Sequence, residues 1–260
     1  MNEQNFEYLK DQLKFTGFGV DLNGQLKENL QKPQNEFTLS HLATYGKDEV
    51  ASRLHFKKST ESDRFFFNSY DASLKKENSE NTLRQNFPIH KDGSVTRKEA
   101  YNLLDGRAVN KDLVNKDGKL YNAWIELNFK ETTSSGNFKL QRYSEQYGFD
   151  LEKALSRLPI KEIGNVQDKS KLLDSLRKGN RQAITLSGND SDQKAFVEAS
   201  PKFKSIVVYD QNHQRIRQNQ SEKNAVSQSQ QQAPDKAEKL HTKTEDHMQQ
   251  QPRKSKGQKM

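Results

Sequence analysis

Apolar and polar positions follow the same order in two separate stretches of the chain. In the first, leucines at helical spacing end at Lys32-Pro33 and lead into strand-like runs that close with Tyr70-Asp71. In the second, leucines end at Lys178-Gly179 and lead into runs that close with Tyr209-Asp210. Helical spacing followed by period-two alternation predicts a short helix and then three strands in each stretch.

The first stretch and the residues before it are predicted to place short helices on a sheet. Residues 5–13 have helical periodicity, and a second apolar stripe stops before Pro33 because proline disfavours a helical residue in front of it. Alternation then predicts strands at 37–39 and 50–56. The run 64–70 is apolar on both faces, which is typical of a central strand. Helices this short are unstable alone, so both should pack on the sheet.

Further elements are predicted between and within the repeats. Thr96 and Glu99 form a capping box that predicts a helix start. A long strand over 121–129 follows a predicted hairpin turn, with Trp124 on the face opposite to its other apolar residues. Asp150 is expected to cap another helix. The strands of the second repeat are expected at 181–186, 194–199 and 204–209.

These elements predict an α+β fold with two related halves. Each half is expected to pack short helices on a mainly antiparallel sheet of three or four strands. The N-terminal half is expected at residues 1–105 and the C-terminal half at 106–212, followed by a disordered tail over 213–260.

The composition of the last 50 residues supports the prediction of a tail. Residues 211–260 contain 12 Gln and no aromatic residue, so they cannot bury enough apolar surface to offset chain entropy. They also contain ten Lys or Arg residues against five Asp or Glu, which is most of the formal net charge of +8. The folded part is predicted to be nearly balanced in charge.

The sequence gives no pattern typical of an enzyme. The absence of cysteine excludes disulfides, thiolate chemistry and Cys-type zinc sites. The glycines of 16–19 lack the spacing of a phosphate loop, and no Gly-x-Ser-x-Gly elbow occurs. We therefore predict a non-enzymatic protein with no catalytic residue, no cofactor and no small-molecule substrate.

The sequence offers only weak candidates for a metal site. The acidic turn 189–192 has calcium-loop spacing but lacks the glycine and the distant glutamate of an EF-hand. The histidines in strand-like segments have no second histidine or carboxylate at ligand spacing nearby, and the others fall in or next to the tail. They are His41, His55, His90, His213, His241 and His247. We predict structural or solvated roles for them, and no metal site.

The chain has no signal-peptide h-region and no apolar stretch of 18 residues. We expect a cytoplasmic protein that does not bind membranes.

Two groups of residues are candidates for interaction. Trp124, Lys130, Lys139 and Arg142 mix an aromatic ring with basic side chains, as single-strand binders do. On the polar face of its strand, Trp124 would be an exposed interface anchor. The alternative is that the apolar residues face the core while the lysines are solvated at the edge.

The second group is the basic end of the tail. Its four cations can neutralise phosphates without a fixed structure. They are Arg253, Lys254, Lys256 and Lys259. The alternative is a solubilising tail.

Several segments resemble an uncharacterised domain family common in Bacteroidetes. The resemblance rests on residues 106–111, 121–125, 147–151, 175–181 and 198–204, and residues 5–111 are similar to the region that precedes the domain in such proteins. Family members occur on mobile and conjugative elements, sometimes fused to topoisomerase-like or primase-like modules. The resemblance implies a DNA-associated accessory role and no active-site residue for this chain.

The expected function is that of a binding or adaptor protein in DNA processing or in transfer of a mobile element. Its partner would be nucleic acid, bound weakly through the basic tail, or an unknown protein. The alternative is a protein-interaction module unrelated to nucleic acid, which would accept its partner at the sheet face around Trp124 or at an exposed strand edge.

Overall fold

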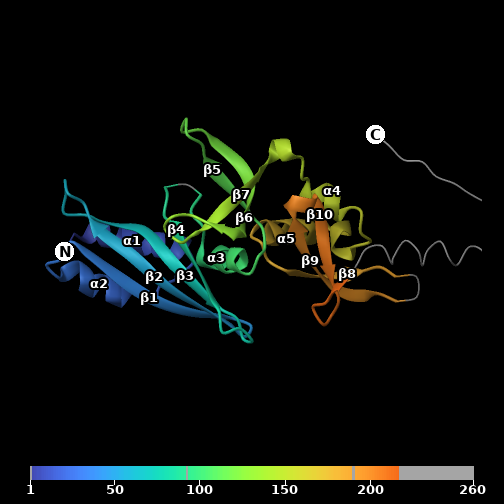
Figure 1. Cartoon of the computed structure of the whole chain (residues 1–260), viewed down its shortest axis with the longest axis horizontal. Coiled ribbons are helices and arrows are strands. Elements are labelled where there is room, and N and C mark those ends of the chain that lie inside the picture. Colours follow the sequence, from blue (N-terminus) through green and yellow to red (C-terminus); the bar gives the residue numbers. More distant parts are fainter. Residues whose placement is uncertain (1, 92, 189–190, 217–260) are drawn as a thin grey trace, which may run out of the picture. The chain divides into compact units, whose positions relative to one another are not determined.

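The computed structural model describes residues 2–91, 93–188 and 191–216. All but the first residues of the expected tail lie outside these ranges, as do Arg253, Lys254, Lys256 and Lys259. Met1–Arg217 group into one unit by their contacts. The described strands form three antiparallel sheets (Figure 1).

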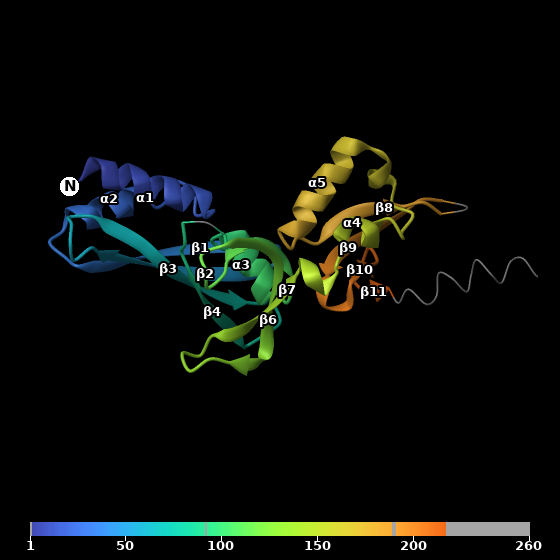
Figure 2. The ribbon, with the colours of Figure 1, turned by 90° about the horizontal axis from the view of Figure 1, so that it is seen from above.

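The first sheet is a four-stranded meander preceded by two helices. Asn2 caps the first helix by accepting a hydrogen bond from the Asn5 N–H, and Gly17 follows its end with φ +84°, which glycine adopts without strain. Both helices lie on one face of the sheet (Figure 2). The elements are α1 Glu3–Phe15, α2 Asn23–Gln31, β1 Glu36–Tyr45, β2 Asp48–Lys58, β3 Phe65–Lys75 and β4 Thr82–Pro88.

Alternation along these strands separates an apolar face from a polar one. Leu54 and Tyr70 are fully buried with Leu9 and Leu26 of the helices in one hydrophobic core. Burying a large apolar side chain stabilises the fold by about 1.5–3 kcal/mol. The residues between these core positions point to the other face, which we call the outer face.

The predicted capping box begins the next helix. The Thr96 N–H donates to Glu99 Oε2 over 2.8 Å, and the Glu99 N–H donates to Thr96 Oγ1 over 3.4 Å. This confirms the predicted helix start. The helix leads into a three-stranded sheet. The elements are α3 Arg97–Leu104, β5 Val109–Val114, β6 Leu120–Thr132 and β7 Phe138–Ser144.

Over residues 123–127, strand β6 is buried on both faces. Ile125 and Leu127 belong to the core of the first sheet, whereas Trp124 belongs to a second core together with Tyr143. The three-stranded sheet therefore contributes one face to each core.

The last sheet is again a meander in chain order. Asp150 caps a short helix by accepting from the Lys153 N–H over 3.0 Å, as predicted. The second core lies between this sheet and its helices. The elements are the 3-10 helix η1 Glu145–Tyr147, α4 Leu151–Leu155, the 3-10 helix η2 Lys161–Gly164, α5 Val166–Arg177, β8 Gln182–Leu186, β9 Gln193–Ser200, the 3-10 helix η3 Pro201–Phe203, β10 Ser205–Tyr209 and β11 Arg215–Ile216.

The structure confirms the α+β class and the antiparallel sheets. Both repeated stretches form a helix followed by strands that pair in chain order, α2-β1-β2-β3 and α5-β8-β9-β10. The second half differs from the expectation because it holds two sheets. The first core also extends across the expected boundary at 105 and 106, up to Leu127. The boundary itself stays a prediction.

Candidate functional site

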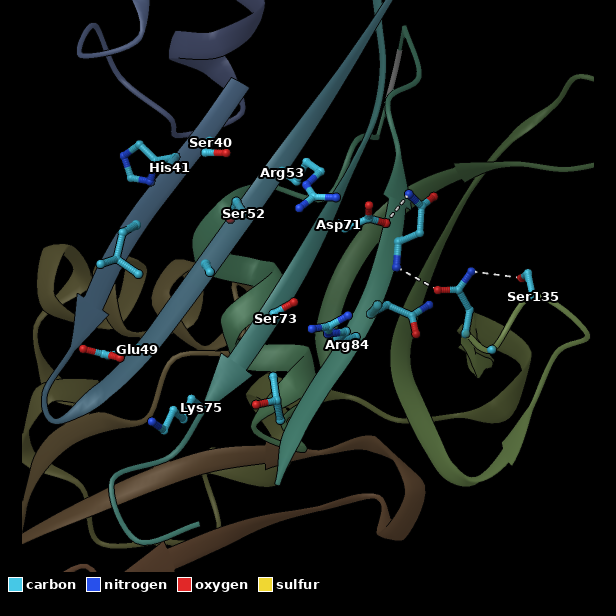
Figure 3. A pocket seen from close by; sticks show the side chains of 17 residues that line it. Ser40, His41, Glu49, Ser52, Arg53, Asp71, Ser73, Lys75, Arg84 and Ser135 are labelled. Atoms are coloured by element: carbon cyan, nitrogen blue, oxygen red, sulfur yellow. Dashed lines mark hydrogen bonds between the residues drawn. The ribbon is translucent and has the colours of Figure 1, made fainter. Parts of the chain in front are cut away.

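The candidate site is a groove on the outer face of β1–β4. It has a volume of about 850 Å³ and opens on the side of the sheet away from the first core (Figure 3). The side chains that carry its chemistry come from three strands and from the turn between β6 and β7. They are Arg53, Asp71, Ser73, Lys75, Arg84 and Ser135.

In the register of the strands, three cationic side chains lie around one small side chain, that of Ser73. Ser73 of β3 lies opposite Ala51 of β2 and Arg84 of β4. Lys75 follows two residues along β3, and Arg53 follows two residues after Ala51, so both share this face. Opposite side chains have Cβ atoms about 5 Å apart and diagonal ones about 7–8 Å. Arg53, Lys75 and Arg84 therefore stand around a floor of small residues.

Asp71 is held by its neighbours on the outer face. His55 Nε2 lies 2.6 Å from Asp71 Oδ2, and Asn86 Nδ2 donates to Asp71 Oδ1 over 2.8 Å. Partial burial raises the pKa of Asp71, but the hydrogen bonds from Asn86 and His55 and the charges of His55 and Arg53 outweigh it and leave the pKa below its ordinary value. Asp71 is therefore a carboxylate at neutral pH with both oxygens engaged.

Arg53 acts through its charge on Asp71, whereas Lys75 and Arg84 have no partner in the described part of the chain. No hydrogen bond or ion pair joins the side chain of Lys75 or Arg84 to another described residue. Glu49 stands opposite Lys75 in the register but does not form an ion pair with it. The groove thus offers three cations against two carboxylates, Glu49 and Asp71, and one of these carboxylates is already engaged.

The turn between β6 and β7 forms a wall beside the groove. Asn137 Oδ1 accepts a hydrogen bond from the Asn86 N–H of β4 over 2.8 Å. Gln85 Oε1 accepts from the Phe138 N–H over 2.8 Å. These bonds occupy part of the free edge of β4. Ser135 lies next to them (Figure 3), and Gly136 also lines the groove.

The outer face also carries exposed apolar side chains. Phe66 is 44% exposed and lies opposite Lys57, and Leu42 of β1 is 63% exposed. β3 is a central strand, as predicted from its apolar run, but Phe66 points to solvent. The apolar run of β3 is therefore only partly buried.

The expected exposure of Trp124 is wrong. Its side chain is only 6% exposed and packs edge-to-face against Phe149, with ring centroids 5.3 Å apart. The reason is that β6 has a core on both faces, so that the face expected to be polar is also covered. Trp124 is a core residue.

The other residues of that group are not gathered around an aromatic ring. Lys130 and Arg142 are exposed, on β6 and β7. Lys139 is also exposed but pairs with Glu131 over 2.8 Å, and its hydrogen bond and charge lower the pKa of Glu131. A basic patch at these three positions stays a prediction.

The residues of the groove were not found from the sequence. His55 and Asp71 are 16 positions apart, so the spacing of histidines and carboxylates along the chain does not reveal the pair. The alternation of polar residues on the strands is the pattern that could have located the face. No cluster of three or more metal-ligating side chains occurs among the described residues.

Comparison with family models, with curated proteins and with solved structures gives no match to this chain. The resemblance to a Bacteroidetes domain family stays a prediction. Among the described helices, none has the length and apolarity needed to cross a membrane.

Proposed function

We propose that this protein is a non-enzymatic nucleic-acid-binding protein that holds a single strand on the outer face of β1–β4. The observation that carries the proposal is the pair of unpartnered cations, Lys75 and Arg84, next to Ser73 in an open groove. An accessory role in DNA processing or in transfer of a mobile element is part of the same proposal and rests on the family resemblance. We also propose that the protein acts in the cytoplasm.

The chemistry of the groove suits phosphate groups. Arg, Lys, Ser and Asn side chains are the usual donors to phosphate oxygens, and such contacts position a strand without selecting its sequence. Arg53, Lys75 and Arg84 supply the charge, and Ser73 supplies a hydroxyl between them. The small side chains of Ala51 and Ser73 leave room for a sugar-phosphate chain to approach the sheet.

The shape of the groove favours an extended ligand. Small-molecule sites are usually concave and mostly apolar, whereas this groove is open and lined by polar strands. Phe66 on the same face offers one ring on which an unpaired base can stack.

The test is the binding of fluorescent single-stranded and double-stranded oligonucleotides by the full chain, followed by anisotropy at 50–200 mM salt. For a single strand, log affinity falls with log salt by about 0.7 per phosphate contact. The double variant Lys75→Gln and Arg84→Gln should therefore bind at least about tenfold more weakly at low salt and lower the slope by about 1.4.

Arg157→Gln is the matched control, because Arg157 is an exposed arginine outside the groove. The affinity of this variant, and the slope of its log affinity against log salt concentration, should equal those of the unmodified protein. Absence of binding to any oligonucleotide at 50 mM salt would refute the proposal. Binding by the double variant equal to that of the control would place the contacts elsewhere, with the basic tail as the first candidate.

The alternative proposal is a protein-interaction module. Among the described strands, β1 pairs only with β2, so its other edge offers unpaired backbone groups to an extended segment of a partner. Capture of one partner that survives nuclease treatment, by a chain that binds no oligonucleotide, would favour this alternative.

A further inference from the structure

An exposed aromatic side chain lies at the connection between β9 and β10. The backbone of this connection is orange in Figure 1. The 3-10 turn η3 presents Phe203 to solvent with 69% of its surface exposed. Lys202 and Lys204 flank it in the sequence and are exposed. Exposed apolar side chains are common on protein surfaces, so the exposure of Phe203 gains meaning only from the groups around it.

The turn that presents Phe203 is held in place. Pro201 is buried at its start, and the Lys204 N–H donates to the Pro201 carbonyl over 2.9 Å. Lys204 has φ +49°, a left-handed conformation that is uncommon for a residue with a side chain. Residues in such conformations are often found where a surface has a function. The exposure of Phe203 is therefore set by the backbone of the turn.

A second ring lies beside the same turn. The Tyr147 hydroxyl donates to the Lys202 carbonyl over 2.7 Å, and the Tyr147 side chain remains 38% exposed. Lys204 Nζ lies 4.7 Å from the centroid of the Tyr147 ring, and Lys202 Nζ lies 5.6 Å from that of Phe203. We call Tyr147, Lys202, Phe203 and Lys204 the aromatic turn.

The charge of the aromatic turn is positive. Neither lysine forms an ion pair with another described residue, although Lys202 is close enough to Glu126 to lower its pKa against the larger effect of burial. Rings that accept the flat face of a base, next to ammonium groups that accept its phosphate, are the combination by which proteins hold unpaired nucleotides. In a duplex the faces of the bases are hidden by stacking, so this combination selects single strands.

We propose that the aromatic turn is a base-stacking contact for single-stranded nucleic acid. This inference rests on the proposed function, because it supplies a second contact for the same class of ligand. The groove on β1–β4 would hold phosphates, and Phe203 and Tyr147 would stack on unpaired bases.

The experiment compares the full chain with its Phe203→Ala variant in binding three labelled ligands at one salt concentration. The ligands are a single strand, a blunt duplex, and a strand of abasic sites that keeps the phosphates. Loss of one stacked base should weaken binding of the normal strand by about 5- to 150-fold. Binding of the duplex and of the abasic strand should be unchanged, because neither offers a free base face.

Phe15→Ala is the matched control, since Phe15 is a phenylalanine of similar exposure, 76%, on α1. It should bind all three ligands like the unmodified chain. A strand carrying 5-iodouracil should also photo-crosslink to Phe203 or Tyr147, which mass spectrometry of the digested adduct would identify.

The outcomes separate this inference from the proposed function. Normal binding of the single strand by Phe203→Ala would overturn the inference, while the groove variants would still test the proposed function. Equal weakening for the abasic strand would also overturn it, because the loss would then not involve bases. No binding by the unmodified chain would overturn both.

Discussion

Trp124 is the only tryptophan of the chain, and it is buried in the second core. Replacing a buried large aromatic side chain by alanine costs about 3–5 kcal/mol. For a domain of this size, 1 kcal/mol corresponds to about 2–4 °C in Tm. Trp124→Ala should therefore lower Tm by about 6–20 °C in thermal unfolding followed by circular dichroism.

Phe15→Ala serves as the control for this measurement, because substitution of an exposed residue usually changes stability by less than about 0.5 kcal/mol. If the Tm of Trp124→Ala lay within about 2 °C of that of the control, the loss in free energy of unfolding would be at most about 1 kcal/mol. Such a small loss would contradict the burial of the indole ring.

Glu126 is a partly buried carboxyl group whose ionisation opposes folding. Burial raises its pKa above 4.5, although the hydrogen bond from Tyr143 and the charge of Lys202 lower it. An acid with a raised pKa in the folded state contributes most to stability below pH 4.5, and this contribution is lost as the pH rises through the folded value. Glu126→Gln should thus raise Tm at pH 7, on the order of 1–2 °C, and leave it unchanged near pH 4.

The control for Glu126→Gln is Glu36→Gln, an exposed residue at the start of β1. Thermal unfolding at both pH values should show no effect of this change. If Glu126→Gln stabilised the protein equally at pH 4 and pH 7, the difference would not come from ionisation of the carboxyl group.

At the scale of elements, the sequence predicts those features of helices and strands that depend on residues close together in the sequence. The capping box of α3, the cap of α4 and the succession of a helix and three strands in the second repeat all come from local patterns, and the structure confirms them. The two faces of β1–β3 also follow from period-two alternation. These features need no knowledge of which strands pair.

The groove could not be predicted because it depends on pairing between strands. A bulge between His55 and Phe56 shifts the register of β2 and β3, and this register decides which residues oppose Ser69, Asp71 and Ser73. The wall from residues 135–137 comes from a hairpin some 50 positions away from β4. The burial of Trp124 was missed for the same reason, since alternation within one strand does not show that both of its faces are covered.

At the scale of the whole molecule, the expected boundary at 105 and 106 is open to a direct test. The core of the first sheet includes Val109, Ile125 and Leu127, which a fragment of residues 1–105 would lack. This fragment should bind a hydrophobic dye and give poorly dispersed amide resonances, because part of its core is exposed. A fragment of residues 1–216 should unfold in a cooperative transition and bind no dye.

The comparison between the two fragments decides between one folding unit and two. A well-dispersed spectrum of residues 1–105, with a sharp thermal transition, would support the expected boundary. It would also mean that the three-stranded sheet adds stability to a domain that is already complete.

The burial of β6 on both faces restricts how the length of this protein can vary. Alternate residues of this strand serve different cores, Trp124 the second and Ile125 and Leu127 the first. Insertion or deletion of a single residue between 123 and 127 would send each side chain to the wrong core, because neither face of the strand is open to solvent there. The turn at 133–137 is fixed to β4. Functional homologues should therefore differ in length at 115–118 and keep the spacing between 123 and 127.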